Sequence, residues 1–136
     1  MRSIGIKNGD PVGVFLPASW IREPYRVKGI AELEGMGLQA IEVADLFNRH
    51  GFCAKEPEKA FSDFKYLLER PDIPILWAGR GGYGSNYLLP YIDRYLKSEP
   101  VIPKKIIIGS SDVSYLLWRL IDVPNLTLLY GPMLYA

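Results

Sequence analysis

A three-layer α/β fold with a mostly parallel sheet is predicted by three features of this 136-residue chain. Short apolar or β-branched runs alternate with amphipathic stretches, turn residues separate them, and no internal repeat is present. Strands and helices that alternate through right-handed crossovers form a parallel sheet covered on both faces. With 49% hydrophobic residues and a length typical of one domain, residues 1–136 are expected to fold as a single α/β domain.

The first half of the chain contains two predicted strands and two predicted helices. Residues 12–16 are an apolar run closed by Pro17, which indicates a buried first strand. Residues 26–36 carry apolar side chains between charges and end at glycines, as a helix does. Residues 38–43 alternate apolar and polar side chains, which predicts a second strand. Residues 56–70 form the clearest helix, because a proline stands in its first turn and its apolar residues share one face.

The second half continues the alternation. Residues 73–78 predict a third strand, and residues 86–96 a helix that bends or restarts at its proline. The isoleucines at 106–108 predict a buried strand, and the apolar spacing within 113–120 is that of one helical face. Residues 126–129 predict a last strand. We also expect Trp77 and Trp118 to lie in the core.

Composition excludes several classes of function. Sixteen basic and 15 acidic residues give a net charge of +1, which provides no electrostatic footprint for nucleic acid. One cysteine and one histidine cannot form an internal disulfide or a Cys/His metal cluster. No segment approaches the ~20 apolar residues of a membrane span, and the first ten residues contain no apolar run of the signal type. A soluble, cytoplasmic chain without metal, cofactor, nucleic-acid partner or membrane partner is therefore predicted.

The turn Gly109-Ser110-Ser111-Asp112 lies between a predicted strand and a predicted helix. A strand, a tight turn with glycine two places before serine, and a helix make up half of the nucleophile-elbow pattern G-x-S-x-G. Val113 stands where the second glycine would be. An elbow raises its serine at the end of a strand, and the N–H groups that follow face a developing oxyanion. The plain alternative is that these residues cap the helix, since Ser and Asp are preferred there.

A second turn, Arg80-Gly81-Gly82-Tyr83-Gly84, directly follows the third predicted strand. Its glycine spacing fits neither G-x-G-x-x-G nor G-x-x-x-x-G-K-[ST], so a nucleotide loop is disfavoured. A backbone nest that donates N–H groups to an oxyanion fits better. If the sheet follows the usual strand order, this loop lies beside the serine turn at the same sheet edge.

Three blocks of the sequence together resemble one family. Residues 80–84 (RGGYG), residues 105–112 (KIIIGSSD) and residues 131–133 (GPM) look like the N-terminal half of the LD-carboxypeptidase family of serine peptidases, which also includes the microcin-C-immunity peptidases. Residues 14–19 (VFLPAS) resemble the family's first strand and its Pro-x-Ser turn. The resemblance covers nearly the whole chain, and it implies a flavodoxin-like fold of the class I glutamine amidotransferase-like kind.

The resemblance also implies roles for particular residues. Ser111 corresponds to the nucleophile, and the backbone N–H groups of Asp112 and of Gly82 (or Gly81) correspond to the oxyanion hole. Members hydrolyse the bond between an L-centre and a terminal D-alanine in murein peptides, without metal or cofactor. Substrate-contact candidates are Arg80, Gly81, Tyr83 and Ser19. Arg80 either pairs with a substrate carboxylate or braces the loop against Asp93 or Asp112, and Ser19 either lines the site or ends the first strand.

The resemblance further implies that the base is missing. In the family, a histidine oriented by a glutamate activates the serine, and both come from a C-terminal domain that this chain lacks. The single histidine, His50, is expected in a surface loop. A serine without a base is a weak nucleophile, so the chain alone is predicted to be nearly inactive. Two alternatives are a non-catalytic peptide-binding module and an interaction domain that forms a homodimer or pairs with a separate C-terminal chain.

Overall fold

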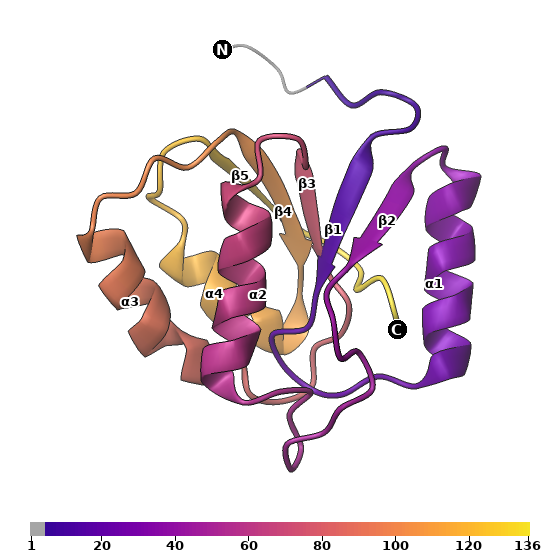
Figure 1. Ribbon diagram of the computed structural model, residues 1–136, viewed down its shortest axis with the longest axis horizontal. Coiled ribbons are helices and arrows are strands. Elements are labelled where there is room, and N and C mark those ends of the chain that lie inside the picture. Colours follow the sequence, from indigo (N-terminus) through magenta and orange to yellow (C-terminus); the bar gives the residue numbers. More distant parts are fainter. Residues whose placement is uncertain (1–4) are drawn as a thin grey trace.

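The computed structural model describes residues 5–136. Five strands form one sheet in the order β2-β1-β3-β4-β5, and every neighbouring pair is parallel (Figure 1). In chain order the strands are β1 (Pro11–Phe15), β2 (Gln39–Glu42), β3 (Ile75–Ala78), β4 (Lys105–Gly109) and β5 (Leu126–Tyr130). This order is that of the flavodoxin-like doubly wound fold, so the predicted fold class is confirmed. Residues 1–4, the start of the segment examined for a targeting signal, lie outside the described part.

The predicted helices are all present, with small shifts in their ends. The helices are α1 (Glu23–Gly35), α2 (Pro57–Glu69), α3 (Leu89–Lys97) and α4 (Ser114–Arg119), and the short 3₁₀ helices are η1 (Ser85–Leu88) and η2 (Ser111–Val113). The first helix begins three residues earlier than predicted, because Pro24 is accepted in its first turn. The predicted restart at Pro90 is where η1 passes into α3. No helix within residues 5–136 has the length and apolar character needed to cross a membrane.

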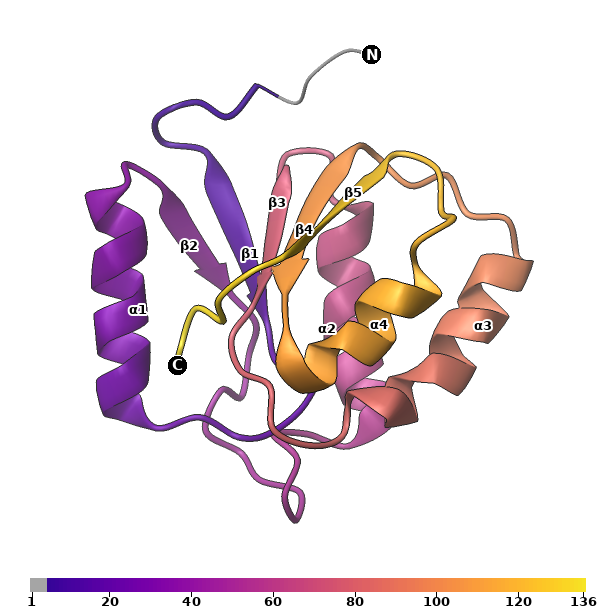
Figure 2. The same cartoon turned by 180° about the vertical axis from the view of Figure 1, so that it is seen from behind.

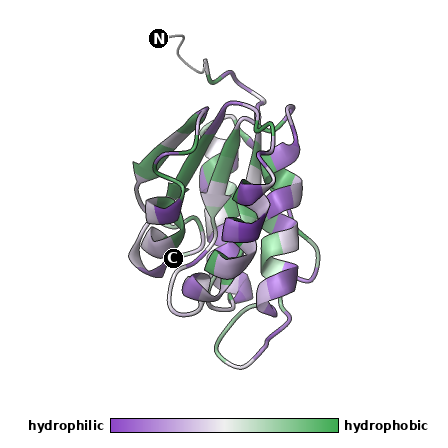
Figure 3. Cartoon of the chain, turned by 90° about the vertical axis from the view of Figure 1, so that its left-hand side faces the viewer, coloured by the Kyte–Doolittle hydropathy of each residue, from purple (hydrophilic) through white to green (hydrophobic). Residues whose placement is uncertain are grey.

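The two faces of the sheet are covered unequally. Helices α2, α3 and α4 lie on one face, whereas α1 and the C-terminal segment lie on the other (Figures 1 and 2). Leu33 of α1 and Tyr135 near the C-terminus pack with Val12, Val14 and Ile75 on the α1 face. The hydropathy colouring shows apolar strands beneath helices whose outer sides are polar (Figure 3). This pattern explains why hydrophobic periodicity, together with turn residues, located the elements.

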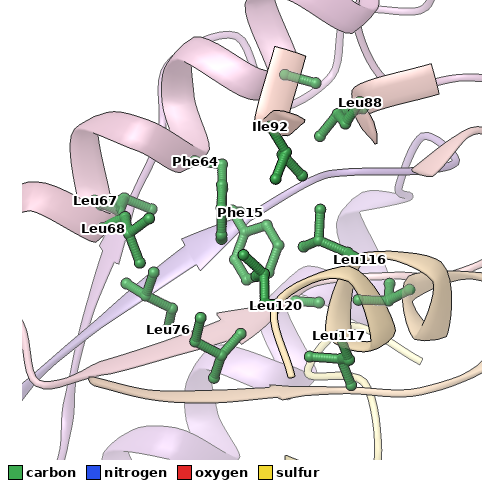
Figure 4. Close-up of a cluster of buried hydrophobic side chains, with 14 of the residues drawn as sticks. Phe15, Phe64, Leu67, Leu68, Leu76, Leu88, Ile92, Leu116, Leu117 and Leu120 are labelled. Carbon is green, nitrogen blue, oxygen red and sulfur yellow. The ribbon is translucent and has the colours of Figure 1, made fainter. Parts of the chain in front are cut away.

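The larger core lies between the sheet and the three helices α2, α3 and α4 (Figure 4). Phe15 of β1 contacts Phe64 of α2, with ring centroids 5.1 Å apart. Leu116 and Leu117 of α4 and Ile92 of α3 close the same cluster. Burial of side chains of this size contributes about 1.5–3 kcal/mol each, so this face anchors the end of β4 and the helix that follows it.

Trp118 does not lie in the core as expected, since 76% of it is exposed. The buried side chains of α4 are Leu116 and Leu117, and Trp118 lies on the outward side of this short helix. Trp77 is half-buried, and its indole N–H donates to the carbonyl of Pro132 at 2.7 Å. The expectation of two core tryptophans was therefore wrong for Trp118.

Lys105, the first residue of β4, has a fully buried side chain. Its ammonium donates hydrogen bonds to the carbonyls of Arg70 and Ile73, and burial lowers its pKa to about 8. These bonds attach the start of β4 to the turn that precedes β3. The central strands are thereby held in a common register, and their carboxyl ends lie together at the lower edge in Figure 1.

Candidate functional site

Ser111 follows β4 in a turn that we call the elbow (residues 109–112). Its φ is +53°, a left-handed value that is uncommon for any residue other than glycine. The side chain is exposed, and the residue opens the 3₁₀ helix η2 that leads into α4. A serine held in a strained turn between a buried strand and a helix has the geometry of a nucleophile elbow.

Val113 occupies the place of the second glycine in the G-x-S-x-G pattern, and the first glycine makes room for it. A Cβ on Gly109 would lie 2.7 Å from Cγ1 of Val113, closer than real side chains approach. Val113 is fully buried against this bare backbone. The elbow therefore tolerates valine at 113 because position 109 has no side chain.

The glycine loop (residues 80–84) lies against the elbow, as the expected strand order predicts. A Cβ on Gly81 would lie 3.3 Å from Oγ of Ser111 and 3.5 Å from the backbone N of Asp112. Gly82 has a φ of +99° and Gly84 one of +120°. The loop thus presents its backbone, and no side chain, to the serine.

Ser19 supports the glycine loop through two hydrogen bonds. Its backbone N–H donates to the carbonyl of Gly81 at 3.0 Å, and its Oγ accepts the N–H of Tyr83 at 3.0 Å. Only 8% of the residue is exposed. Both of its polar groups near the loop are used, which favours a supporting part for Ser19 over direct contact with a ligand.

Asp112 joins the elbow to the end of the glycine loop. Its Oδ2 accepts the backbone N–H of Ser85 at 2.8 Å, and its carbonyl accepts the Ser85 hydroxyl. Through the bond to the Ser85 N–H, Asp112 caps η1, a helix 27 residues away in sequence. Neither η2 nor α4 has a side-chain cap of its own. The alternative that Ser110, Ser111 or Asp112 only caps the following helix is therefore not supported.

The third sequence block also reaches the elbow. Gly131 N–H donates to the carbonyl of Gly109 at 3.0 Å, and the sulfur of Met133 accepts the N–H of Ser110 at 3.3 Å. Blocks that lie far apart in the sequence, RGGYG, GSSD and GPM, are therefore in contact.

Two backbone donors are available around Ser111. Within residues 5–136, neither the N–H of Gly82 nor that of Asp112 donates a hydrogen bond to a protein acceptor. Gly82 is exposed and Asp112 follows the serine directly, at the start of a helix. Unpaired N–H groups beside an exposed serine can stabilise negative charge on a tetrahedral intermediate.

No base lies against the serine in the described part of the chain. The Ser111 hydroxyl has no hydrogen-bond partner there, and the Nδ1 of His50 lies 3.8 Å from Glu56 in an exposed loop. Cys53 does not replace it, because burial raises the pKa of its thiol. Among residues 5–136 no group of acidic, histidine or cysteine side chains could hold a metal ion.

Comparison with known proteins agrees with this arrangement. The model of the peptidase S66 LD-carboxypeptidase N-terminal domain matches residues 12–131, most of the chain. The chain belongs to this family. Residues 80–84 and 105–112 lie inside the matched range, which ends at Gly131, the first residue of the third block.

Relatives of the LD-carboxypeptidase domain are enzymes of murein peptides and a self-immunity protein. The murein tetrapeptide carboxypeptidase of Pseudomonas aeruginosa is 31% identical over 106 residues, covering 78% of this chain and 34% of that protein. The microcin C7 self-immunity protein MccF of Escherichia coli is 28% identical over 129 residues, covering 93% of this chain and 37% of that protein. The chain spans about two fifths of the length of the curated relatives it matches.

Solved structures of the family share the fold. The wild-type apo structure of MccF superposes with a TM-score of 0.81 at 25% identity, over 96% of this chain and 39% of that one. Muramoyltetrapeptide carboxypeptidase from Oxalobacter formigenes gives a TM-score of 0.76 at 23% identity, over 93% and 41% of the two chains.

Two expected substrate contacts in the LD-carboxypeptidase domain lie at the rim of the glycine loop. Arg80 donates to the carbonyl of Trp20 and forms no pair with Asp93 or Asp112, so of its two alternatives the acidic brace is wrong. Tyr83 is 48% exposed, and its hydroxyl bonds that of Tyr87, which raises the pKa of Tyr83.

Sequence reasoning missed Arg22 and Arg49, which lie beside Arg80 around the ring of Trp20. Each of the three arginines follows a different strand, β1, β2 or β3. Because carboxyl ends of parallel strands meet at one edge, this placement was the available signal.

Proposed function

We propose that this chain is the nucleophile-bearing domain of a serine LD-carboxypeptidase that acts on murein peptides. The observation that carries the proposal is the strained, exposed Ser111 packed against Gly81, with unpaired N–H groups on both sides. The names of the relatives, murein tetrapeptide carboxypeptidase among them, support the substrate class. The bond to be hydrolysed joins an L-centre to a terminal D-alanine.

The reaction proposed is acyl transfer through a covalent intermediate. The Oγ of Ser111 attacks the scissile carbonyl carbon, and a base takes the hydroxyl proton. The carbonyl oxygen becomes an oxyanion that accepts hydrogen bonds from the N–H groups of Asp112 and Gly82. The intermediate collapses, the C–N bond breaks, and the proton passes to the amine of the leaving D-alanine. Water then hydrolyses the acyl-serine ester and restores the hydroxyl.

Supports for the two donor loops come from the chain itself. The bond from Ser85 to Asp112 fixes the elbow relative to η1, and Ser19 fixes Gly81 and Tyr83. Donors that are held in place before the reaction need no reorganisation when charge develops. Removal of one such donor costs other serine hydrolases about 10²–10³ in kcat.

The base is proposed to come from outside the described residues, in a further domain or a partner chain. No histidine or carboxylate of residues 5–136 bonds the serine hydroxyl. The chain by itself is therefore expected to release D-alanine at most slowly. We place the complete reaction in the cytoplasm, in the recycling of peptidoglycan.

A chimera tests the proposal directly. This chain would replace the matching N-terminal part of the Pseudomonas murein tetrapeptide carboxypeptidase, and D-alanine release from a murein tetrapeptide would be followed by mass spectrometry. We expect turnover that Ser111→Ala lowers by about 10³-fold or more. Ser110→Ala is the matched control, because Ser110 is the adjacent serine and is expected to leave turnover within a few-fold.

Three results would contradict parts of the proposal. Activity of the chimera that survives Ser111→Ala would exclude Ser111 as the nucleophile, and a folded chimera without activity would contradict the assignment of this chain as the nucleophile-bearing domain. Normal turnover by the 136-residue chain alone would show that a base lies within it. Saturable binding of the tetrapeptide without release, by the chimera as well as by the chain, would favour the peptide-binding module.

A further inference from the structure

Three arginine side chains gather around one indole ring at the carboxyl edge of the sheet. The guanidinium carbon of Arg49 lies 3.6 Å from the centroid of the Trp20 ring, and those of Arg22 and Arg80 each lie 5.5 Å from it. We call Arg22, Arg49 and Arg80 the arginine cluster. A cation–π contact in an exposed site contributes about 0.5–1 kcal/mol. Such a contact orients a guanidinium but does not neutralise its positive charge.

The cluster has no acidic partner. Within residues 5–136, no ion pair involves any of its three arginines. Two acidic residues that are close to the cluster in sequence lie against other basic side chains. Glu23 lies 3.1 Å from Arg26, and Glu56 lies by His50. Three like charges therefore gather around one indole ring in a chain whose total net charge is only +1.

The cluster adjoins the elbow through the residues that build the site. Trp20 follows Ser19, which holds the glycine loop, and Arg80 precedes Gly81, which touches Ser111. Arg80 is itself anchored by its bond to the carbonyl of Trp20. Arg22 and Arg80 thus lie on the same two segments that place the backbone donors, and Arg49 joins them through its contact with the ring of Trp20.

A hollow of about 390 Å³ opens beside two members of the cluster, lined by Arg22, Tyr25, Arg80, Tyr135 and Ala136. Arg49 lines a different hollow, which also contains Asp45 and Glu56. This volume suits a small ligand or the end of a peptide. Arg22 is exposed and Arg80 is half-buried, so guanidinium N–H groups on two sides of the hollow can reach an anion. The planar guanidinium binds carboxylates in bidentate fashion, which makes an arginine-lined hollow selective for them.

We propose that the arginine cluster is a carboxylate-binding site that holds acidic groups of the peptide substrate next to Ser111. The use of the site by a peptide rests on the function proposed above, whereas its affinity for carboxylates does not. Murein tetrapeptides carry several carboxylates, and two arginines that line one hollow, with a third on the same indole ring, match a ligand with more than one. The cluster would select anionic peptides and fix their direction across the elbow.

The first experiment tests the site without a peptide. Citrate is added to the ¹⁵N-labelled chain, and the indole N–H resonance of Trp20 is followed against sodium chloride of equal ionic strength. We expect a saturable shift with citrate. The double variant Arg22→Gln/Arg49→Gln should weaken citrate binding about tenfold or more, the loss typical of charge-assisted bonds.

Arg94→Gln is the matched control for this titration. Arg94 is an exposed arginine 6.0 Å from the ring of Tyr91 on α3, away from the elbow, and should leave citrate affinity unchanged. No shift beyond that of chloride, or an equal loss in Arg94→Gln, would overturn the site.

The second experiment tests what the site holds. A murein tetrapeptide should displace citrate, and the same peptide with its carboxylates converted to amides should not. Failure of the tetrapeptide to compete would overturn the assignment to a peptide carboxylate. The role of Ser111 is measured separately, by D-alanine release from the chimera. A failed binding experiment therefore leaves the proposed nucleophile untouched, and an inactive chimera leaves the carboxylate site untouched.

Discussion

Residues with positive φ occur in both turns of the site, at Ser111 (+53°) in the elbow and at Gly82 (+99°) and Gly84 (+120°) in the glycine loop. Glycine adopts such angles readily, whereas another residue there costs about 1–3 kcal/mol. The elbow therefore retains strain that the glycine loop avoids. The difference follows from what each turn presents, a side chain in the elbow and bare backbone in the loop.

The same contrast appears in packing. Gly81 and Gly82 have their missing side-chain positions filled by Ser111 and Ser19, two serines from the segments that follow β4 and β1. The elbow instead needs space at Gly109, behind the serine, for a buried valine. Glycines in the glycine loop leave room for serine side chains from other segments, whereas the glycine of the elbow leaves room for the buried side chain of Val113.

The largest effect is expected for Gly82→Ala. Its Cβ would lie 2.7 Å from Cβ of the buried Ser19, and alanine would also be forced to a φ of +99°. We expect a loss of about 2–4 kcal/mol in the free energy of unfolding, measured with urea. Gly51→Ala is the control, because Gly51 has a φ of +62° but no neighbour within 4 Å. It should cost only about 1 kcal/mol, and equal losses would show that packing against Ser19 is unimportant.

Gly109→Ala should destabilise the elbow by about 1–3 kcal/mol through the clash with Val113, without a change in φ. Adding Val113→Ala removes the clashing methyl groups. The double variant is expected to lose about 1 kcal/mol less than the sum of the two single variants, by urea unfolding. Gly35→Ala, with nothing within 4 Å, should be neutral or stabilising. Strict additivity of the double variant would remove Val113 as the reason for glycine at 109.

The elements of this fold were predictable because their signals are local. A β-branched run such as residues 106–108 and the apolar face of α2 each lie within one window of sequence. The meeting of the two turns followed from strand order alone, since β3 and β4 are neighbours. Fold class and the place of the site therefore needed no knowledge of side-chain contacts.

The partners of individual polar groups could not be predicted in the same way. Arg80 bonds a carbonyl 60 residues away, and Asp112 caps η1 rather than its own helix. Capping preferences describe only the helix that follows a residue, so the sequence contained no signal for the bond to Ser85. Trp118 was misplaced because α4 is one short helix with a single buried side.

Asp112→Ala tests whether the two turns form one unit. The variant leaves the buried N–H of Ser85 without its acceptor, and a lost cap of this kind costs about 1–2 kcal/mol in the free energy of unfolding. Asp112→Asn keeps an acceptor oxygen and should lose less. Asp122→Ala, at an exposed position, is the control and should stay within about 0.5 kcal/mol of the parent. If Asp112→Ala unfolds at the same urea concentration as the control, the bond does not couple the turns.

The smallest effect, and the one that bears most directly on the contrast, is expected at Ser111. Ser111→Gly should stabilise the chain by about 0.5–1 kcal/mol relative to Ser111→Ala, because glycine relieves the strain at a φ of +53°. This gain in the folded state is larger than the cost of the greater conformational entropy that glycine gives to the unfolded chain. Both variants remove the hydroxyl, so their difference in urea unfolding isolates the backbone. An alanine variant as stable as the glycine variant would mean that the elbow stores no strain. A more stable glycine variant would mean that serine is retained there against the preference of the backbone, as a residue needed for its side chain.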